Sequence, residues 1–530
     1  MPPHSKPFDT PFDIPYIPPI TLVELRMSYY SGEIRSRPRW WMKIHEPPIA
    51  ATWHEEIVEH DRLYKQDEED GPKWDGVKWR PRDSLTEAQL SYIFDELRYE
   101  ASKRDPATGI FASSIRKVYE SHSLIDTELR ERLVKATSII ETDSDDDKDW
   151  HSGPGGRCFD LVDPSLYPIS IGHGLFCPPN PSAGQEPELM LLDNDRYLEA
   201  RPDLKDISTF RAYAVSPAYQ WLPTDFAVSA DGNATALGYI NNVHPFRHRA
   251  LYPAITSRVV ARFVPMFERV LIDVLYPPSK PTKNVGDWYK HIEASAPPWE
   301  PKDTYYKRRA EWARIHEWLH VPEPEAFAPP SADNPRFEFS LRGRTIQVVI
   351  KHTEVRLTPE DSTYPGDVWH VEGMANERIV ATALYCYAME NVTVSRIAFR
   401  QRVGAGEYGN DLPRGDNKGQ PLGHVALGED KCVAFPNVYQ HREEPFELVD
   451  KTRPGRRKLL ALFLVDPNVR ILSPADVPPQ QREWTLAEAE KALVVQNLPQ
   501  EPVDMIVGFA EDGFMTREQA EKHRLKLMEE

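Results

Sequence analysis

The spacing of hydrophobic and polar positions changes from helical to strand-like near residue 335. Before that point, the segment 84–105 has apolar side chains every three or four residues, so they share one face of a helix. These side chains are Leu90, Ile93, Phe94 and Leu97. Ser84 or Thr86 stands just ahead of them as a candidate N-cap. This pattern predicts an amphipathic helix.

Two further helical patterns lie on either side of the strand-like region. Residues 251–277 have a helical period with Pro265 inside it. Because proline lacks an amide hydrogen and clashes with the preceding turn, we expect Pro265 to kink or divide that helix. The chain ends in a short helix in which Thr516 and Gln519 have the spacing of a capping box.

From Phe337 onward, short apolar runs are separated by Gly, Pro, Asn and Asp, a pattern typical of strands. The runs are 337–358, 378–388, 392–403, 431–441 and 457–472. We therefore predict an α+β protein with a double-stranded β-helix, or jelly-roll, core. The expected division is a Pro-rich and mostly helical N-terminal region at 1–334 that packs on the core, the metal-binding jelly roll at 335–475, and a helical C-terminal tail at 476–530.

Composition narrows the class of protein. Fifty prolines in 530 residues are roughly twice the usual share of about 5%, which favours long ordered loops. The formal net charge of −18 argues against a nucleic acid or an anionic membrane surface as partner. The four cysteines form no C-x-x-C pair, and no run of 18 or more apolar residues occurs. We expect a soluble, cytoplasmic protein.

His370 and Glu372 are the first candidates for metal ligands. They follow a Pro-Gly turn and precede the apolar run at 378–388. Residues i and i+2 of a strand face the same way, so both side chains can reach one ion. His441, at the end of another apolar run, is the best candidate for a third ligand. Two histidines and one carboxylate form the usual non-haem Fe(II) site, which keeps positions open for substrate or O₂.

The pattern His-x-Glu is not specific, because it also occurs at His54/Glu56, His291/Glu293, His352/Glu354 and His441/Glu443. His352 and Glu354 are the serious competitors, since they too lie on a strand and face one way, but no turn precedes them. The first two pairs fall outside the strand region and are expected to be solvated. The alternative for His370, Glu372 and His441 themselves is a set of hydrogen-bonded polar groups at strand ends.

The order of residues around His441 resembles the second half of 2-oxoglutarate-dependent Fe(II) dioxygenases, in particular the prolyl-hydroxylase-like members. The matching positions are Phe435, Pro436, His441, Pro445, Gly455 and Arg457. This resemblance implies that His370, Glu372 and His441 are the catalytic residues that hold Fe(II). It also implies that Arg457 binds the distal carboxylate of 2-oxoglutarate, a role suited to a planar guanidinium.

The chain departs from that family in two ways. Most members use His-x-Asp, whereas this chain has the rarer His-x-Glu. The segment from His441 to Arg457 is also longer than usual, so the alternative anion ligands are Lys451, Arg453 and Arg456. The alternative for Arg457 itself is a surface ion pair with the acidic segment that contains Glu443 and Glu444. Four residues flank the expected site and are candidates for contacts with the keto acid or the substrate: Tyr364, Asn376, Thr382 and Tyr385.

Over nearly its whole length the chain also resembles a family of fungal proteins classed as a domain of unknown function. The segments that carry this second resemblance are 21–44, 219–226, 238–245, 369–385 and 440–481. It implies membership of that family but says little about which reaction the protein catalyses.

Three hypotheses for function follow. The first is a non-haem Fe(II)/2-oxoglutarate-dependent oxygenase that oxidises a small organic molecule, by default through hydroxylation, and releases succinate and CO₂. The second is a cupin-like metalloenzyme that does not use 2-oxoglutarate. The third is a non-enzymatic jelly-roll binding protein. We expect a small-molecule substrate, no nucleic acid and no membrane; the sequence does not set the oligomeric state.

Overall fold

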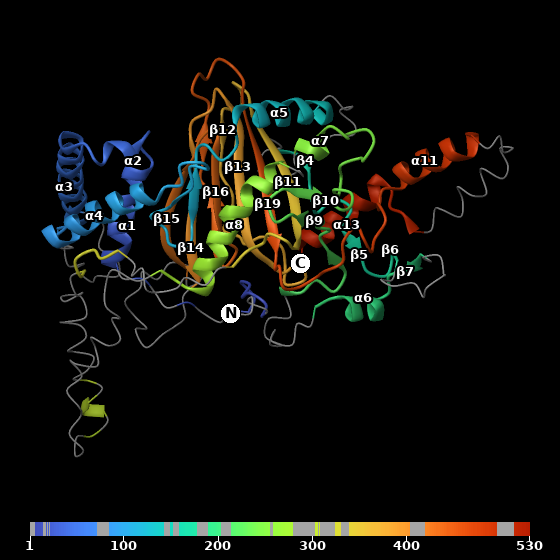
Figure 1. Cartoon of the computed structure of the whole chain (residues 1–530), viewed down its shortest axis with the longest axis horizontal. Coiled ribbons are helices and arrows are strands. Elements are labelled where there is room, and N and C mark those ends of the chain that lie inside the picture. Colours follow the sequence, from blue (N-terminus) through green and yellow to red (C-terminus); the bar gives the residue numbers. More distant parts are fainter. Residues whose placement is uncertain are drawn as a thin grey trace.

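Strands form the centre of the molecule and helices surround them in the computed structural model (Figure 1). The strands are β1 (Phe111–Ala112), β2 (Tyr119–Ser121), β3 (Asp149–His151), β4 (Cys158–Val162), β5 (Ile169–Ser170), β6 (Leu175–Phe176), β7 (Met190–Leu191), β8 (Tyr219–Gln220), β9 (Thr224–Val228), β10 (Ala234–Ala236), β11 (Thr345–Leu357), β12 (Thr363–Tyr364), β13 (Ile379–Glu390), β14 (Ser395–Arg402), β15 (Gly419–Leu427), β16 (Lys431–Pro436), β17 (Tyr439–Glu443), β18 (Phe446–Glu447) and β19 (Gly455–Val465). The helices are α1 (Leu22–Arg35), α2 (Trp40–Lys43), α3 (Pro47–Asp70), α4 (Glu87–Lys103), α5 (Thr127–Glu141), α6 (Asn194–Ala200), α7 (Leu251–Ala254), α8 (Val260–Leu275), α11 (Arg482–Val495) and α13 (Arg517–Glu529). The structure describes residues 6–13, 17, 20, 22–70, 84–141, 149–151, 158–177, 189–202, 214–254, 258–278, 301, 303–305, 307, 324–329, 339–402, 419–495 and 513–529.

Ten strands form one large antiparallel sheet. Its order is β1-β2-β16-β13-β19-β11-β4-β3, and β9 pairs with both β10 and β11. The long central strands β11, β13 and β19 coincide with apolar runs in the sequence, and most of their residues are buried. Strands buried on both faces are expected to show such nearly continuous apolar runs.

The large sheet is not confined to the core predicted at 335–475. Six of its strands, β1 to β4, β9 and β10, come from the region expected to be mostly helical. These strands have only two to five residues each, which is too short for an alternating pattern to stand out in the sequence. The predicted boundaries at 334 and 475 stay a prediction, but the sheet extends across the first of them.

A second, three-stranded sheet has the order β15-β14-β17 and faces the large sheet. Val433, Phe435 and Phe463 of the large sheet pack in one hydrophobic cluster with Ile397 and Phe399 of the small one. The two sheets lie on either side of this cluster, but the described strands do not close into a barrel. The mixed α/β architecture with a large antiparallel sheet is confirmed, whereas the predicted jelly roll is not.

The other face of the large sheet is covered by helices. α8 lies across β13 and β16, and α5 packs against β13 and β4 (Figure 1). The apolar face of α8 is buried there, with Val264, Phe267 and Val270 among its buried residues. α8 continues through Pro265 as one helix, so the alternative that Pro265 divides this segment was wrong. Burial of this face outweighs the loss of one backbone hydrogen bond at the proline.

Two predicted helix starts are confirmed by their caps. The side chain of Thr86 accepts a hydrogen bond from the Gln89 amide and begins α4, so Thr86 and not Ser84 is the N-cap. Thr516 and Gln519 form the reciprocal pair of a capping box: the Thr516 amide donates to Gln519 Oε1 and the Gln519 amide donates to Thr516 Oγ1.

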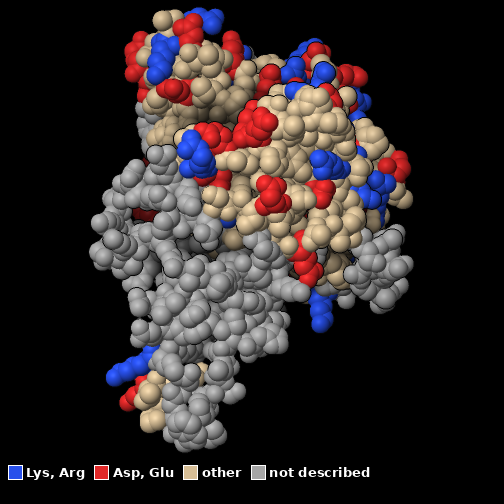
Figure 2. Space-filling view, turned by 90° about the vertical axis from the view of Figure 1, so that its left-hand side faces the viewer, with Lys and Arg blue, Asp and Glu red and all other residues tan. Residues whose placement is uncertain are grey.

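The described surface mixes charges of both signs. On the face shown in Figure 2, acidic and basic side chains are interspersed over the described residues. Among the described helices, none combines the length and the apolar character needed to cross a membrane.

The pairing of distant strands leads to a first prediction. We expect that a fragment starting at residue 335 does not fold as a stable monomer. Such a fragment removes β4 and β9 from β11, β2 from β16, and α8 from the buried face of the sheet. Size-exclusion chromatography and thermal unfolding of the fragment beside the full chain test this expectation. A monomeric fragment with a cooperative unfolding transition would contradict it.

Candidate metal centre

The three predicted ligands come from two neighbouring backbone segments. The segment with His370 lies beside β17, which carries His441, and the two residues exchange backbone hydrogen bonds. His370 N–H donates to His441 O over 3.1 Å, and His441 N–H donates to His370 O over 2.9 Å. A pair of residues joined in this way holds its side chains close on the same face. The sequence thus brings positions 71 residues apart together through one antiparallel bridge.

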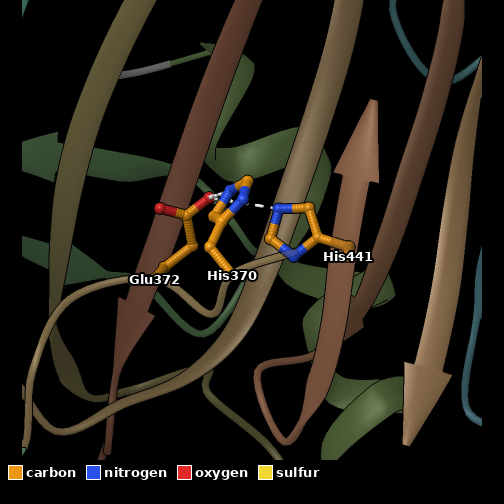
Figure 3. A group of neighbouring side chains, drawn as sticks. All are labelled: His370, Glu372 and His441. Atoms are coloured by element: carbon orange, nitrogen blue, oxygen red, sulfur yellow. Dashed lines mark ion pairs between the residues drawn. The ribbon is translucent and has the colours of Figure 1, made fainter. Parts of the chain in front are cut away.

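The side chains of His370, Glu372 and His441 converge on one point (Figure 3). Glu372 Oε1 lies 3.3 Å from His441 Nε2 and 3.7 Å from His370 Nε2, and the two imidazole centroids are 4.4 Å apart. One ligand atom from each residue lies within 4.8 Å of the other two. Among the described residues, this is the one group of three or more His, Cys, Asp or Glu residues with such a spacing.

The surroundings orient each ligand. His370 Nδ1 lies 2.8 Å from the Val368 carbonyl oxygen. Because a carbonyl only accepts, Nδ1 carries the proton and Nε2 keeps its lone pair toward the cluster. The ring of Phe435 packs edge-on against the His441 ring at 4.8 Å. These contacts fix two imidazoles with their Nε2 atoms facing one carboxylate.

Asn437 fixes the backbone of Glu372. Its Oδ1 accepts a hydrogen bond from the Glu372 amide over 2.9 Å, and its Nδ2 donates to the Glu372 carbonyl over 2.9 Å. Asn437 is fully buried and also donates to the Ile379 carbonyl. The sequence analysis did not single out this residue, although its place directly after Phe435-Pro436 was a visible signal of a turn.

The electrostatics of the cluster favour a charged carboxylate. Burial works against ionisation of Glu372, but the hydrogen bonds and charges of His370 and His441 outweigh it and hold the pKa of Glu372 far below its usual range. Burial also disfavours a charged His370, yet the hydrogen bond and the charge of Glu372 raise its pKa above 6.5. For His441, burial and the charge of His370 prevail and lower its pKa. The cluster therefore favours an ionised Glu372 facing the two imidazoles.

His352 and Glu354, the competing pair, lie on the opposite face of the large sheet. Both are fully buried, and His352 Nε2 contacts the Tyr387 hydroxyl, which lies in the cluster between the sheet and the helices. Glu354 accepts a hydrogen bond from Arg356 over 2.7 Å. Residues of odd number on β11, such as Val349, face the space between the two sheets instead. The competing pair thus does not reach the cluster of His370, Glu372 and His441.

Arg457 is buried between the two sheets but is already paired. Its guanidinium forms an ion pair with Glu443 of β17, with 2.6 Å between Nη2 and Glu443 Oε2. Nη1 donates to Ser395 Oγ over 2.8 Å, and the ring of Phe446 lies 4.7 Å from the guanidinium carbon. The side chains of Arg457 and Glu443 are only 2% and 6% exposed.

The three alternative cations lie at the surface. Lys451 pairs with Glu447, Arg453 with Asp450 and Arg456 with Glu390, and the side chains of these cations are 48% to 70% exposed. Of the four cations considered in the sequence, only Arg457 is buried.

The four flanking candidates separate into two sets. Tyr364 is buried and packs on Phe446, next to Arg457, and donates to Asp367. Thr382 is buried opposite Phe435, and its hydroxyl has no hydrogen-bond partner among the described residues. Asn376 instead bonds to Tyr197 and to the backbone of residues 216 and 219. Tyr385 faces the helices on the other side of the sheet.

Of the four, Thr382 is therefore placed between the two sheets and Tyr364 beside Phe446 and Arg457. Thr382 and Tyr385 are three positions apart on β13, and residues an odd number of positions apart on a regular strand face opposite sides of the sheet. This explains why the two side chains lie on different faces.

Comparison with protein families gives a match over most of the chain. The model of a family described as "Protein of unknown function (DUF4246)" matches residues 87–488. A second one, described as "Domain of unknown function DUF4246, N-terminal", matches residues 2–56. No curated protein matches the chain.

Several solved structures are weakly similar to the chain. One is IDO from Bacillus thuringiensis, with 6% identity, a TM-score of 0.17, and coverage of 31% of this chain and 58% of that one. Another is the Fe(II)/(alpha)ketoglutarate-dependent dioxygenase TqaL, with 8% identity, a TM-score of 0.21, and coverage of 48% and 70%. A third is AviO1 from Streptomyces viridochromogenes Tue57, with 13% identity, a TM-score of 0.15, and coverage of 31% and 82%. The chain spans less than two thirds of the first, and with TM-scores this low the likenesses establish no activity.

Proposed function

The chain belongs to the DUF4246 family of proteins of unknown function, and from the geometry of its His370–Glu372–His441 cluster we propose that it is a non-haem Fe(II)- and 2-oxoglutarate-dependent oxygenase. Its substrate would be a small organic molecule, and hydroxylation the default reaction. The single observation that carries the proposal is the convergence of two imidazole Nε2 atoms and one carboxylate oxygen (Figure 3). Two histidines and one carboxylate with open positions are the donor set typical of non-haem Fe(II) oxygenases.

The residues present fit a divalent metal. His370 Nε2, His441 Nε2 and Glu372 Oε1 are all directed to one point, and Asn437 and Val368 hold two of these ligands in place. Ligand residues are commonly oriented by such hydrogen bonds to their other atoms. With Fe(II) and 2-oxoglutarate bound, the site would supply the activation of O₂, with succinate and CO₂ as co-products.

The fit of 2-oxoglutarate is less direct. Arg457 is a buried cation on β19, as the resemblance to the dioxygenases implies, but its guanidinium already holds Glu443. A distal carboxylate can form a bidentate contact with Arg457 only after Glu443 moves, because Glu443 lies against both terminal nitrogens. This observation favours a second candidate function, a cupin-like metalloenzyme that does not use 2-oxoglutarate and in which Arg457 is structural.

The arrangement of the sheets supports interpreting the strands as a jelly roll. The large and the small sheet face each other across one hydrophobic cluster, and the ligands lie where β17 meets the segment before β13. In a jelly roll, two sheets pack in this manner and their inner faces can hold a metal.

An anaerobic titration tests the proposed function. Fe(II) is added to the full chain first, and 2-oxoglutarate second. We expect one equivalent of metal to bind and a weak visible charge-transfer band to appear with the keto acid. Metal binding without the band would favour the cupin-like alternative. Absence of metal binding would reject both enzymes and leave a non-enzymatic binding protein.

The raised pKa of His370 leads to a second prediction, that the affinity for the metal falls as the pH falls. The hydrogen bond and the charge of Glu372 outweigh burial and raise that pKa above 6.5. A proton on Nε2 excludes the metal from it, so protons compete with the metal at a higher pH than for an ordinary imidazole, and increasingly as the pH is lowered. Titrations between about pH 8 and pH 6 measure this effect. A constant affinity across that range would contradict it.

A further inference from the structure

The ion pair between Arg457 and Glu443 lies on the same side of β17 as the candidate metal ligands. Glu443 follows His441 by two residues on β17, and both are buried whereas Arg442 between them is half-exposed. Residues i and i+2 of a strand face the same way, so the Glu443 carboxylate points into the space between the sheets beside His441. Arg457 reaches it from β19 on the opposite sheet.

We propose that Glu443 determines which 2-oxo acid binds beside the metal. The inference rests on the proposed function and deepens it. The carboxylate of Glu443 lies against both terminal nitrogens of Arg457, and only Nε has no hydrogen-bond partner among the described residues. An acid with a distal carboxylate, such as 2-oxoglutarate, must therefore displace Glu443 to form a bidentate contact with the guanidinium. A 2-oxo acid without a distal carboxylate, such as 2-oxobutyrate, forms no ion pair with Arg457 and therefore binds without displacing Glu443.

Charge and burial explain why the displacement is costly. The two side chains are 2% and 6% exposed, and Arg457 also donates to Ser395 Oγ. If a ligand carboxylate takes the guanidinium, Glu443 loses its ion-pair partner inside the protein, and a buried carboxylate without a partner is strongly disfavoured. The affinity for 2-oxoglutarate is therefore reduced by the need to move Glu443, whereas the affinity for 2-oxobutyrate is not.

Glu443→Gln removes the competing charge and keeps the size of the side chain. Glu444→Gln is the matched control, because Glu444 is the next residue and is partly exposed. Its backbone N–H donates a hydrogen bond to the Arg396 carbonyl. Glu443→Asp keeps the charge on a shorter side chain and should give an intermediate result. Circular dichroism and thermal unfolding of each full-length variant establish that it is folded.

The experiment is the anaerobic calorimetric titration of the Fe(II)-loaded chain with each acid. In Glu443→Gln we expect the affinity for 2-oxoglutarate to rise at least about 10-fold relative to that for 2-oxobutyrate, the lower end of measured effects of close charge pairs. Glu444→Gln should leave the ratio of the two affinities unchanged. A residue with only a structural role would change both affinities together and leave the ratio as it is.

The outcomes separate the two proposals. If both acids bind but their affinity ratio is the same in wild type, Glu443→Gln and Glu443→Asp, the role of Glu443 is overturned and the proposed function stands. If neither acid binds any metal-loaded variant, the 2-oxo acid part of the proposed function fails and the role of Glu443 falls with it. If Glu443→Gln does not fold, the ratio in Glu443→Asp decides, and an unchanged ratio there overturns the inference.

Discussion

Replacing Glu372 with alanine is expected to lower the affinity of the chain for Fe(II) by more than about 100-fold. Loss of a residue that merely orients a metal ligand typically costs 10- to 100-fold in affinity, and Glu372 is one of three ligands itself. It also provides the only carboxylate of the cluster. Without it, two imidazoles remain, and the positive charge of the ion is no longer balanced. Equilibrium titration with Fe(II) under anaerobic conditions measures the change.

Glu354→Gln is the matched control for this experiment. Glu354 belongs to the competing His-x-Glu pair, is fully buried, and lies on the face of the large sheet that packs against helices. The amide keeps the shape of the side chain, so the fold should tolerate it better than alanine. We expect this variant to bind the metal as the wild type does. Equal loss of metal in the Glu372 and Glu354 variants would contradict the assignment of the cluster.

The second large effect concerns stability. Arg457→Leu is expected to lower the free energy of unfolding by about 3–5 kcal/mol, because it leaves the carboxylate of Glu443 buried without its partner. The double variant Arg457→Leu/Glu443→Leu should recover much of that loss, since an apolar pair of similar volume often replaces a buried ion pair without cost. Urea unfolding of the wild type and the variants measures both quantities.

Arg456→Leu is the control for the stability measurement. Arg456 is the neighbour of Arg457 on β19 but pairs with Glu390 at the surface, with both side chains about half-exposed or more. Exposed ion pairs contribute at most about 1 kcal/mol, so the variant should be nearly as stable as the wild type. Similar losses in the Arg456 and Arg457 variants, or no recovery in the double variant, would contradict a buried ion pair as the cause.

The three residues of the cluster could be picked out because each has a local signal in the sequence. Pro365-Gly366 marks the turn before His370, the i, i+2 spacing sets His370 and Glu372 on one side, and His441 ends an apolar run. The caps of α4 and α13 could likewise be predicted from the sequence, since a capping residue and its partner are only three positions apart.

Two features could not be predicted for the opposite reason. The sequence pointed to Glu443 only through one of several His-x-Glu patterns and as part of an acidic segment that could pair with Arg457 at the surface. That the two residues pair in the interior follows from the meeting of β17 and β19 across the space between the sheets. No spacing along the chain encodes that approach. The strands before residue 335 were missed because each is too short to show a period of its own, and β2, β4 and β9 pair with strands far along the chain.

The pairing of β2 with β16 has a consequence for how the chain acquires its structure. β2 ends at Ser121, and its partner β16 begins at Lys431, about 310 residues later. At synthesis rates of about 5–20 residues per second, β16 is synthesised roughly 15–60 s after β2. Contacts this distant in sequence also make folding slow. The sheet is therefore completed only late in translation, and until then its early strands expose unpaired edges, where assistance by chaperones would matter most.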